Sequence, residues 1–147
     1  MKLDIYQVDA FAEKNFEGNP AAVVPLDRWL PDVVMQAIAE ENNLAETAFF
    51  VPSEKGFHIR WFTPNSEVKL CGHATLASAY ALFTFLGCKE KALSFDSLYG
   101  VLRVTKEDDF LTLDFPVQPP EVCSAPALLT AGLGKAPVAC LKHDDHI

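Results

Sequence analysis

The sequence predicts an α+β fold in which a sheet curls around one buried helix. Residues 72–86 are apolar around the whole circumference of a helix, and such a helix is buried on all sides. Short runs of strand length, bounded by turn residues, lie on both sides of this segment. The chain has 147 residues, 50% of them hydrophobic and 22% charged, which fits a globular protein with a substantial core.

Two strands are predicted at the start of the chain. Residues 2–10 alternate polar and apolar side chains with the period of a strand. Gly18, Asn19 and Pro20 predict a turn, and the apolar residues 21–25 predict the returning strand.

A surface helix and two further strands are expected next. Pro31 suits the first position of a helix that continues at helical spacing to Glu41, where asparagines can end it. Residues 44–51 and 57–63 are rich in β-branched and aromatic side chains and predict strands.

The remaining elements follow the buried helix, which Gly87 ends. Turn residues separate short apolar runs, and a Pro-rich segment at residues 116–126 indicates a linker. The expected elements are strands at residues 92–96, 100–105 and 110–115, a helix at 126–133 and a strand at 137–142.

Charge and hydropathy exclude several partners. With 20 acidic and 12 basic residues the net charge is −8, so we expect no nucleic acid to bind. No apolar run reaches the roughly 18 residues that cross a bilayer, and the first residues do not resemble a secretory signal. We therefore expect a cytoplasmic protein that does not bind membranes.

The four cysteines are expected to be free thiols, because they are scattered without C-x-x-C pairs. Cys140, His143 and His146 have a spacing seen among metal ligands, but no fourth ligand is evident, so we expect no metal. The chain has no phosphate-binding glycine motif and no nucleophile elbow, and no organic cofactor is expected.

Glu46 is the first candidate for chemistry. It lies in an apolar strand-like stretch, and burial would raise the pKa of its carboxyl towards the range useful for proton transfer. Because side chains alternate along a strand, Glu46 could equally point to water while Thr47 faces the core.

The second candidate is His73, at the start of the buried helix. Unpaired N–H groups and the helix dipole would stabilise a negative charge there, with Gly72 allowing close approach and Thr75 adding a hydroxyl. His73 could instead be an exposed residue or bond a carbonyl. Cys71 could be a thiolate of lowered pKa or an inert packing residue.

Two polar residues could complete a substrate site. Asn19 could donate to a substrate carboxylate, although it could also be a simple turn residue. Ser66 could line the same cleft or lie in a surface loop.

Five motifs, in order, resemble the phenazine-biosynthesis PhzF-like family. The resemblance covers residues 3–115, and a single one of these motifs would be weak evidence. The motifs are Asp9-Ala10-Phe11, the segment 16–23 with Gly18-Asn19-Pro20, the segment 43–49 around Glu46, the segment 60–64, and the segment 67–77 with Cys71-Gly72-His73-Ala74-Thr75.

The resemblance implies a diaminopimelate-epimerase-like fold, in which two similar lobes, each a mixed sheet around a central helix, enclose an active site. Residues 1–118 would form the amino-terminal lobe, and residues 119–147 a linker and the start of the second lobe. Family members need no metal or organic cofactor, are generally homodimers, and isomerise small carboxylate-bearing substrates by moving a proton.

By position in these motifs, Glu46 matches the family's acid/base glutamate and His73 the histidine that assists it. The expected substrate-binding residues are Asn19, Gly72, Ala74 and Thr75, which lie in these motifs, and Ser66, which lies between the last two of them.

The chain also departs from the family. Members are roughly twice as long, and nothing here matches their D-P-x-T-G-S-A-H segment; residues 95–100 also lack the usual Thr-x-Ser-Gly pattern. A cysteine pair would need a partner for Cys71 from the second lobe.

Three hypotheses follow. The first is a cofactor-independent isomerase that uses Glu46 and His73, inactive in this half-length form, and the second is a two-base racemase that uses Cys71. The third is a non-catalytic single-lobe module that binds or self-associates, because a cleft with one side missing exposes an apolar patch.

Overall fold

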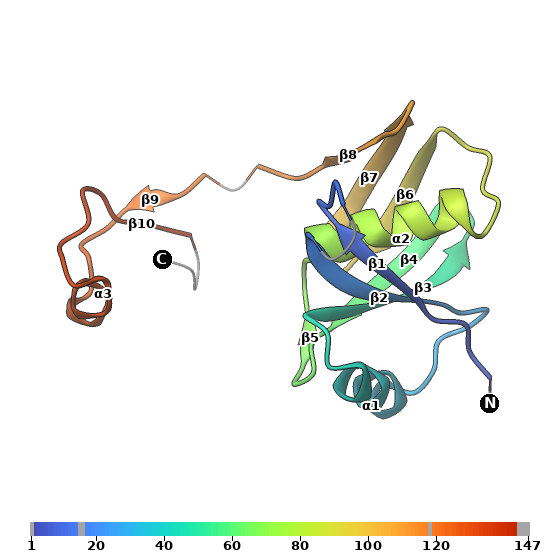
Figure 1. Cartoon of the computed structure of the whole chain (residues 1–147), viewed down its shortest axis with the longest axis horizontal. Coiled ribbons are helices and arrows are strands. Elements are labelled where there is room, and N and C mark those ends of the chain that lie inside the picture. The colour runs from blue at the N-terminus through green and yellow to red at the C-terminus, as the bar shows by residue number, and fades with distance from the viewer. Residues whose placement is uncertain (1, 15–16, 118, 144–147) are drawn as a thin grey trace. The chain divides into compact units, whose positions relative to one another are not determined.

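The computed structural model describes residues 2–14, 17–117 and 119–143. The chain divides into two compact units, residues 1–115 and residues 116–147, and each is described by itself. Figure 1 shows the elements of both units.

Unit 1 is built on one eight-stranded mixed sheet. Strands β2 and β3, and strands β4 and β6, pair in parallel, whereas the other pairs are antiparallel. The short strand β5 (Glu67–Val68) lies off the main order of strands and pairs with β4. The main order is β1 (Tyr6–Ala10), β2 (Asn19–Pro25), β3 (Glu46–Ser53), β4 (Gly56–Phe62), β6 (Ala92–Ser97), β7 (Gly100–Glu107) and β8 (Phe110–Asp114).

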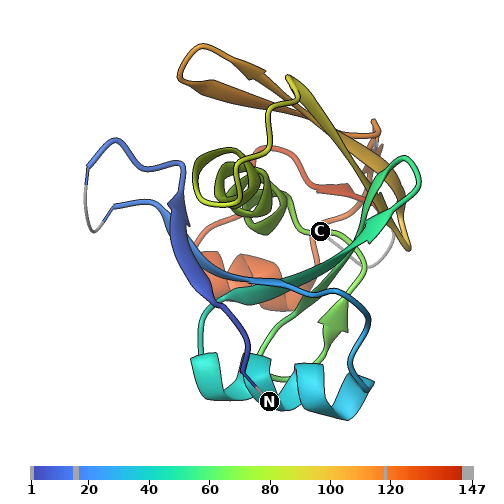
Figure 2. The same ribbon diagram turned by 90° about the vertical axis from the view of Figure 1, so that its right-hand side faces the viewer.

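Helix α2 (Gly72–Thr84) lies inside the curve of this sheet. Figure 2 looks nearly along α2 and shows the strands bending around it. The alanines of α2 and Leu82 pack with Trp61 and Phe95 in the larger of two hydrophobic clusters. The expected sheet curled around a buried helix is confirmed.

Helix α1 (Asp32–Asn42) covers the opposite face of the sheet. Pro31 precedes the helix as its N-cap, and Asn43 ends it in the left-handed conformation with φ 50°. Met35 and Ala39 pack with Phe49 and neighbouring residues in the second cluster. The sheet is therefore covered on both faces at β3.

Strand β3 shows how this two-sided burial orients side chains. Ala48 and Phe50 belong to the cluster around α2, whereas Phe49 and Val51 belong to the cluster around α1. Since strand side chains alternate between the two faces, Glu46 falls on the α2 side.

The expected turn at Asn19 and Pro20 is wrong, because both residues belong to β2 and pair with Ala10 and Asp9. Proline lacks an N–H and is tolerated at the first residues of a strand, before pairing exists on both sides. Here the pairing with β3 begins only at Ala21.

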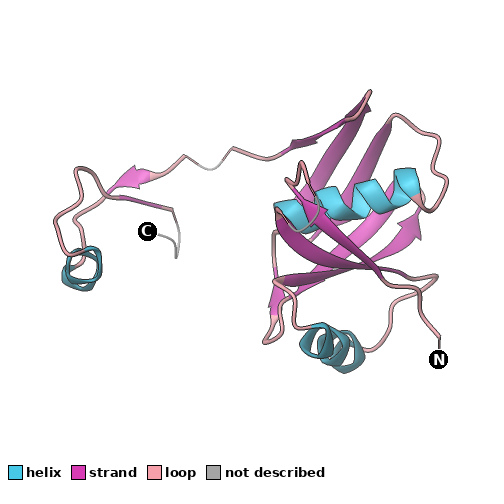
Figure 3. Ribbon diagram, in the orientation of Figure 1, coloured by secondary structure: helices cyan, strands magenta, loops and turns pink. Residues whose placement is uncertain are grey.

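Unit 2 contains a two-stranded antiparallel sheet and one short helix (Figure 3). Strand β9 (Glu121–Val122) pairs with β10 (Leu141–Lys142), and α3 (Ala127–Leu133) lies between them in the sequence. Gly134 ends α3 in the left-handed conformation. Among the described residues of the chain, none of the helices is long and apolar enough to cross a membrane.

Candidate active site

The first residues of β3 and α2 meet on the inner side of the sheet. Glu46 begins β3, and its neighbour in register on β2 is Ala21. His73 is the second residue of α2, which packs against β2 and β3. Two-sided burial of β3 directs Glu46 towards α2 and not to water.

Glu46 and His73 form a close, largely buried pair. The distance from Glu46 Oε2 to His73 Nε2 is 3.2 Å, and the two side chains are only 20% and 9% exposed. Nε2 is buried and makes no hydrogen bond of good geometry, so the contact with Glu46 is close but poorly aligned. A polar ring atom without a hydrogen-bond partner in a buried setting is available to a ligand.

Cys71 completes this cluster from the residue before α2. Its Sγ lies 3.4 Å from His73 Nδ1. Burial raises the pKa of the Cys71 thiol to about 12, the nearby Glu46 carboxylate adds to this effect, and the Ala74 backbone N–H opposes it. Cys71 is therefore a protonated thiol at neutral pH, and the thiolate of lowered pKa is wrong.

The three groups are close enough to suggest a metal site, since their ligand atoms lie within 4.8 Å of one another. The imidazole ring, however, faces Cys71 with Nδ1 and Glu46 with Nε2. A metal ion bound here would use one ring nitrogen, and Cys71 would first have to lose its proton, which its raised pKa opposes.

Three of the helix-start residues lie within or beside this cluster. Ala74 and Thr75 are fully buried, and the Thr75 hydroxyl donates to the Cys71 carbonyl. The space beside the Gly72 Cα is filled by Phe115, since an added Cβ would lie 2.6 Å from its ring. Leu111 and Leu113 pack against the same core, so a period of two along β8 could have predicted that Phe115 faces α2.

The other two predicted binding residues lie at different places. Asn19 begins β2 beside the start of β3, so Asn19 and Glu46 lie at the same end of the sheet. Ser66 is exposed in the turn between β4 and β5, where its N–H donates to the Thr63 hydroxyl. Among the described residues, no hydrogen bond or ion pair joins Ser66 to Glu46 or His73.

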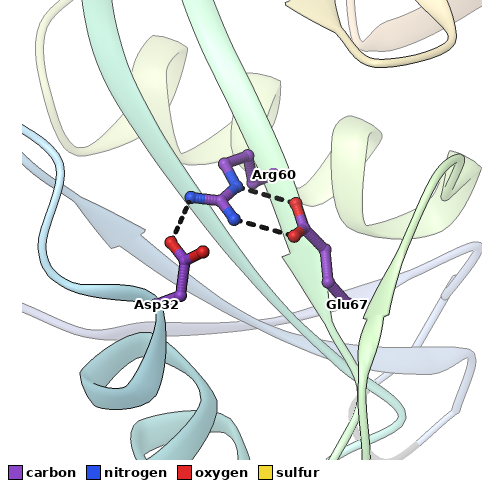
Figure 4. A network of polar contacts seen from close by, with 3 residues as sticks. All are labelled: Asp32, Arg60 and Glu67. Atoms are coloured by element: carbon purple, nitrogen blue, oxygen red, sulfur yellow. Dashed lines mark hydrogen bonds and ion pairs between the residues drawn. The ribbon is translucent and has the colours of Figure 1, made fainter.

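An ion network supports the segment that leads to the site (Figure 4). Arg60 on β4 makes two hydrogen bonds of 2.7 Å to Glu67 on β5 and one of 2.9 Å to Asp32 at the start of α1. This geometry raises the pKa of Arg60, chiefly through Glu67, and lowers the pKa of Asp32. The network holds β5 in place only a few residues before Cys71, and no pattern in the sequence predicts it.

Cys140 and His143, two of the three candidate ligands near the end of the chain, lie among the described residues. His146 lies outside these residues, so the expected absence of a metal there stays untested. Cys140 instead lies opposite Cys123, with the two Sγ atoms 3.4 Å apart. All four cysteines are free.

Comparison with known proteins identifies relatives over nearly the whole chain. A family model described as phenazine biosynthesis-like protein matches residues 8–137. An uncharacterized isomerase of Pseudomonas aeruginosa is 52% identical over 147 residues, which are 100% of this chain and 57% of that protein.

Solved structures of relatives have the same fold. A phenazine biosynthesis PhzF-family protein from Enterococcus faecalis is 49% identical and superimposes with a TM-score of 0.85, over 95% of this chain and 54% of that one. A predicted epimerase from Pseudomonas aeruginosa, 26% identical, reaches a TM-score of 0.68 over 85% of this chain and 46% of that one.

The chain spans about half the length of these relatives. The region matched by the family model contains Glu46, Cys71 and His73, so the buried cluster lies inside the shared part of the sequence. The curled sheet around α2 is the lobe that the motifs led us to expect. The chain therefore belongs to the phenazine biosynthesis-like (PhzF) protein family.

Proposed function

We propose that this chain provides one side of the active site of a cofactor-independent isomerase. Glu46 removes a proton from a carbon next to a carboxylate or enamine and returns it at a second position. The observation that carries the proposal is the buried Glu46–His73 pair at the start of a helix, with Nε2 lacking a hydrogen bond.

The surroundings suit a small carboxylate-bearing substrate. His73 and the backbone N–H groups of the first turn of α2 lie where negative charge is stabilised by the helix dipole. As the proton leaves carbon, the developing charge would be held by these donors. Asn19, at the same end of the sheet, could donate its side-chain amide to the substrate carboxylate.

Cys71 is a poor choice for the base. Because the pKa of its thiol is raised to about 12, the thiolate that a two-base racemase requires is scarce at neutral pH. This favours Glu46 as the residue that exchanges protons with substrate.

Exchange of deuterium from solvent tests these roles. A panel of small amino acids and cyclic unsaturated carboxylates is incubated in D₂O with residues 1–147 and the second half of the Pseudomonas aeruginosa isomerase added together, and loss of carbon-bound hydrogen is followed by NMR. We expect Glu46→Gln to lower the exchange rate by about 10²- to 10⁴-fold, as for loss of a general base, and Cys71→Ser to retain most of it. The reverse pattern would favour the two-base mechanism.

The matched assay uses residues 1–147 alone and together with the second half of the Pseudomonas aeruginosa isomerase. A site enclosed by two lobes needs both to exclude water and orient substrate, so we propose that residues 1–147 by themselves are inactive. Activity that appears only with the added half would support a shared site, and full activity of residues 1–147 alone would contradict it.

A second candidate is a non-catalytic module that self-associates, and one surface feature favours it. A cavity of about 680 Å³ lies beside α2, lined by Leu76, Tyr80 and the exposed rings of Phe11, Phe85 and Phe110. Charged residues such as Asp9, Glu13 and Lys14 also line the cavity, and the three exposed rings are the apolar surface that would promote association. Light scattering of residues 1–147 tests this, because a strict monomer with turnover would exclude the module and a homodimer without turnover would favour it.

A further inference from the structure

Cys123 and Cys140 lie directly opposite each other at one end of the small sheet of unit 2. The register of β9 and β10 pairs Val122 with Leu141, so the next opposing pair is Cys123 and Cys140. The Cys123 N–H donates to the Cys140 carbonyl over 2.9 Å, and their sulfur atoms are 3.4 Å apart.

This geometry fits a disulfide without rearrangement of the backbone. Opposing residues of a hydrogen-bonded antiparallel pair have Cα atoms about 5.5 Å apart, within the range of about 4.4–6.8 Å that disulfides span. The sulfur atoms would have to approach to about 2.0 Å, which side-chain rotation can supply. The other two cysteines, Cys71 and Cys88, do not belong to this small sheet, because both lie in unit 1, where Cys71 contacts His73.

Unit 2 has little else to hold it together. Among its described residues Cys140 is the one buried side chain, and α3 has no buried residue. Its sheet is a ladder of two residue pairs. A covalent link that closes the segment between Cys123 and Cys140 would restrict the unfolded chain, as in small domains without a core.

We propose that Cys123 and Cys140 form a reversible thiol–disulfide pair that is oxidised by small-molecule disulfides such as glutathione disulfide. The Cys123 thiolate attacks one sulfur of the oxidant, forming a mixed disulfide and releasing one glutathione thiolate. The Cys140 thiolate then attacks the Cys123 sulfur and releases the second glutathione. Two protein thiols become one disulfide, one glutathione disulfide becomes two glutathione thiols, and the two protons pass to the leaving thiolates.

The environment of the two thiols sets the order of these steps. The order follows from access, because the Cys123 side chain is only partly buried and can meet a dissolved oxidant. Cys140 is the more buried of the two. Cys123 is therefore the first nucleophile and Cys140 resolves the mixed disulfide.

Peptide mapping of the folded chain in glutathione redox buffers tests the pair. Trypsin cuts after Lys106, Lys135 and Lys142, which places Cys123 in peptide 107–135 and Cys140 in peptide 136–142. A Cys123–Cys140 disulfide therefore gives one linked pair of peptides, which dithiothreitol separates. The same oxidation of the chain unfolded in urea shows what random pairing yields.

We expect the 107–135/136–142 link to exceed every other cysteine link in the folded chain by about tenfold, because proximity raises the effective concentration of the second thiol. Cys88→Ser is the matched control and should leave the link unchanged, whereas Cys123→Ser should abolish it. Only glutathione adducts, or the link distribution of the urea-unfolded chain, would overturn the proposal.

A second probe requires no oxidant. Phenylarsine oxide bridges two close thiols, so the reduced folded chain should bind one equivalent of it. The Cys140→Ser variant should bind none. Failure of the reduced folded chain to bind the arsenical would also count against the pair.

Discussion

The reactivity of Cys71 depends on its place beside Glu46 and inside the core. The thiol is 7% exposed, and its pKa of about 12 compares with an ordinary value of 9.0. A buried thiol next to a carboxylate resists ionisation because both burial and like charge disfavour the thiolate. Because these two effects act only in the folded state, the folded protein is more stable while Cys71 remains protonated.

Alkaline unfolding should report this contribution. The folded pKa of Cys71 lies above the unfolded one, so its contribution is complete below about pH 9 and is lost as pH rises towards about 12. The shift of roughly three pKa units corresponds to at most about 4 kcal/mol. Cys71→Ala should therefore flatten the fall in the free energy of unfolding between pH 8 and 10.5, measured with urea.

Cys88→Ala is the control for loss of a thiol elsewhere in unit 1, and it should keep the wild-type slope. If Cys71→Ala and the wild type lose stability equally over this range, the raised pKa of Cys71 is refuted.

Two glycines of unit 1 differ in what a methyl group would meet. At Gly56, with φ +140°, an added Cβ would lie 2.3 Å from the Ser94 carbonyl oxygen, which is backbone. At Gly72 it would meet the tip of the Phe115 ring, which can swing aside because Phe115 is 42% exposed. We expect Gly56→Ala to cost about 3 kcal/mol or more and Gly72→Ala about 1 kcal/mol.

Chemical denaturation of both variants measures these costs, and Gly72→Ala should cost little when it is introduced into Phe115→Ala, which removes the ring. Equal losses in the two single variants would contradict this prediction, because they would show that the Ser94 backbone and the Phe115 ring move aside equally easily.

At the scale of elements, local patterns predicted most of the structure. Helix α2 was predictable because a helix that is apolar on every side must be buried in the core. Helix α1 was predictable because Pro31 and Asn43 mark its ends. Strands β5 and β9 have two residues each and no period, so nothing in the sequence marks them.

The site was only partly predictable for a related reason. The motif resemblance singled out Glu46 and His73, but the direction of Glu46 depends on the helices that cover β3 on both sides. Both that burial and the parallel pairing of β2 with β3 join residues that are far apart in the sequence, so a local pattern cannot predict them. Alternation along the strand could not decide between core and water, because β3 is apolar on both faces.

The Arg60 network joins three elements, and its two carboxylates contribute unequally. Glu67 accepts two hydrogen bonds and is 26% exposed, whereas Asp32 accepts one and is 73% exposed. Arg60 also lies over the rings of Trp29 and Phe62, at 5.5 and 5.2 Å. Most of the stabilisation should therefore come from the Glu67 side.

Arg60→Lys tests this, because an ammonium group cannot reproduce the two parallel hydrogen bonds to Glu67. We expect it to cost about 1–3 kcal/mol in the free energy of unfolding, close to the cost of Glu67→Gln, with little change for Asp32→Asn. A larger loss in Asp32→Asn than in Glu67→Gln would contradict the assignment.

At the scale of the whole molecule, the hydrophobic core belongs to unit 1. Both clusters are formed by residues between Leu3 and Leu113, and the strands that enclose α2 end at Asp114. Unit 2 has one buried side chain among its described residues. Since burial of apolar area is the main stabilising contribution to folding, the two units should differ greatly in stability.

Truncation tests that difference directly. Residues 1–115 contain every strand that encloses α2 and both clusters, so this fragment should unfold cooperatively, with a Tm within a few degrees of the chain of 147 residues. Residues 116–147 have a ladder of two residue pairs and a seven-residue helix, too little to offset the loss of chain entropy, so this segment by itself, with both cysteines reduced, should give the circular dichroism of an unfolded peptide. The strands and helices of residues 1–115 already bury the core, so we expect no help from the segment after Phe115. Loss of cooperative unfolding in this fragment would show that unit 1 requires that segment.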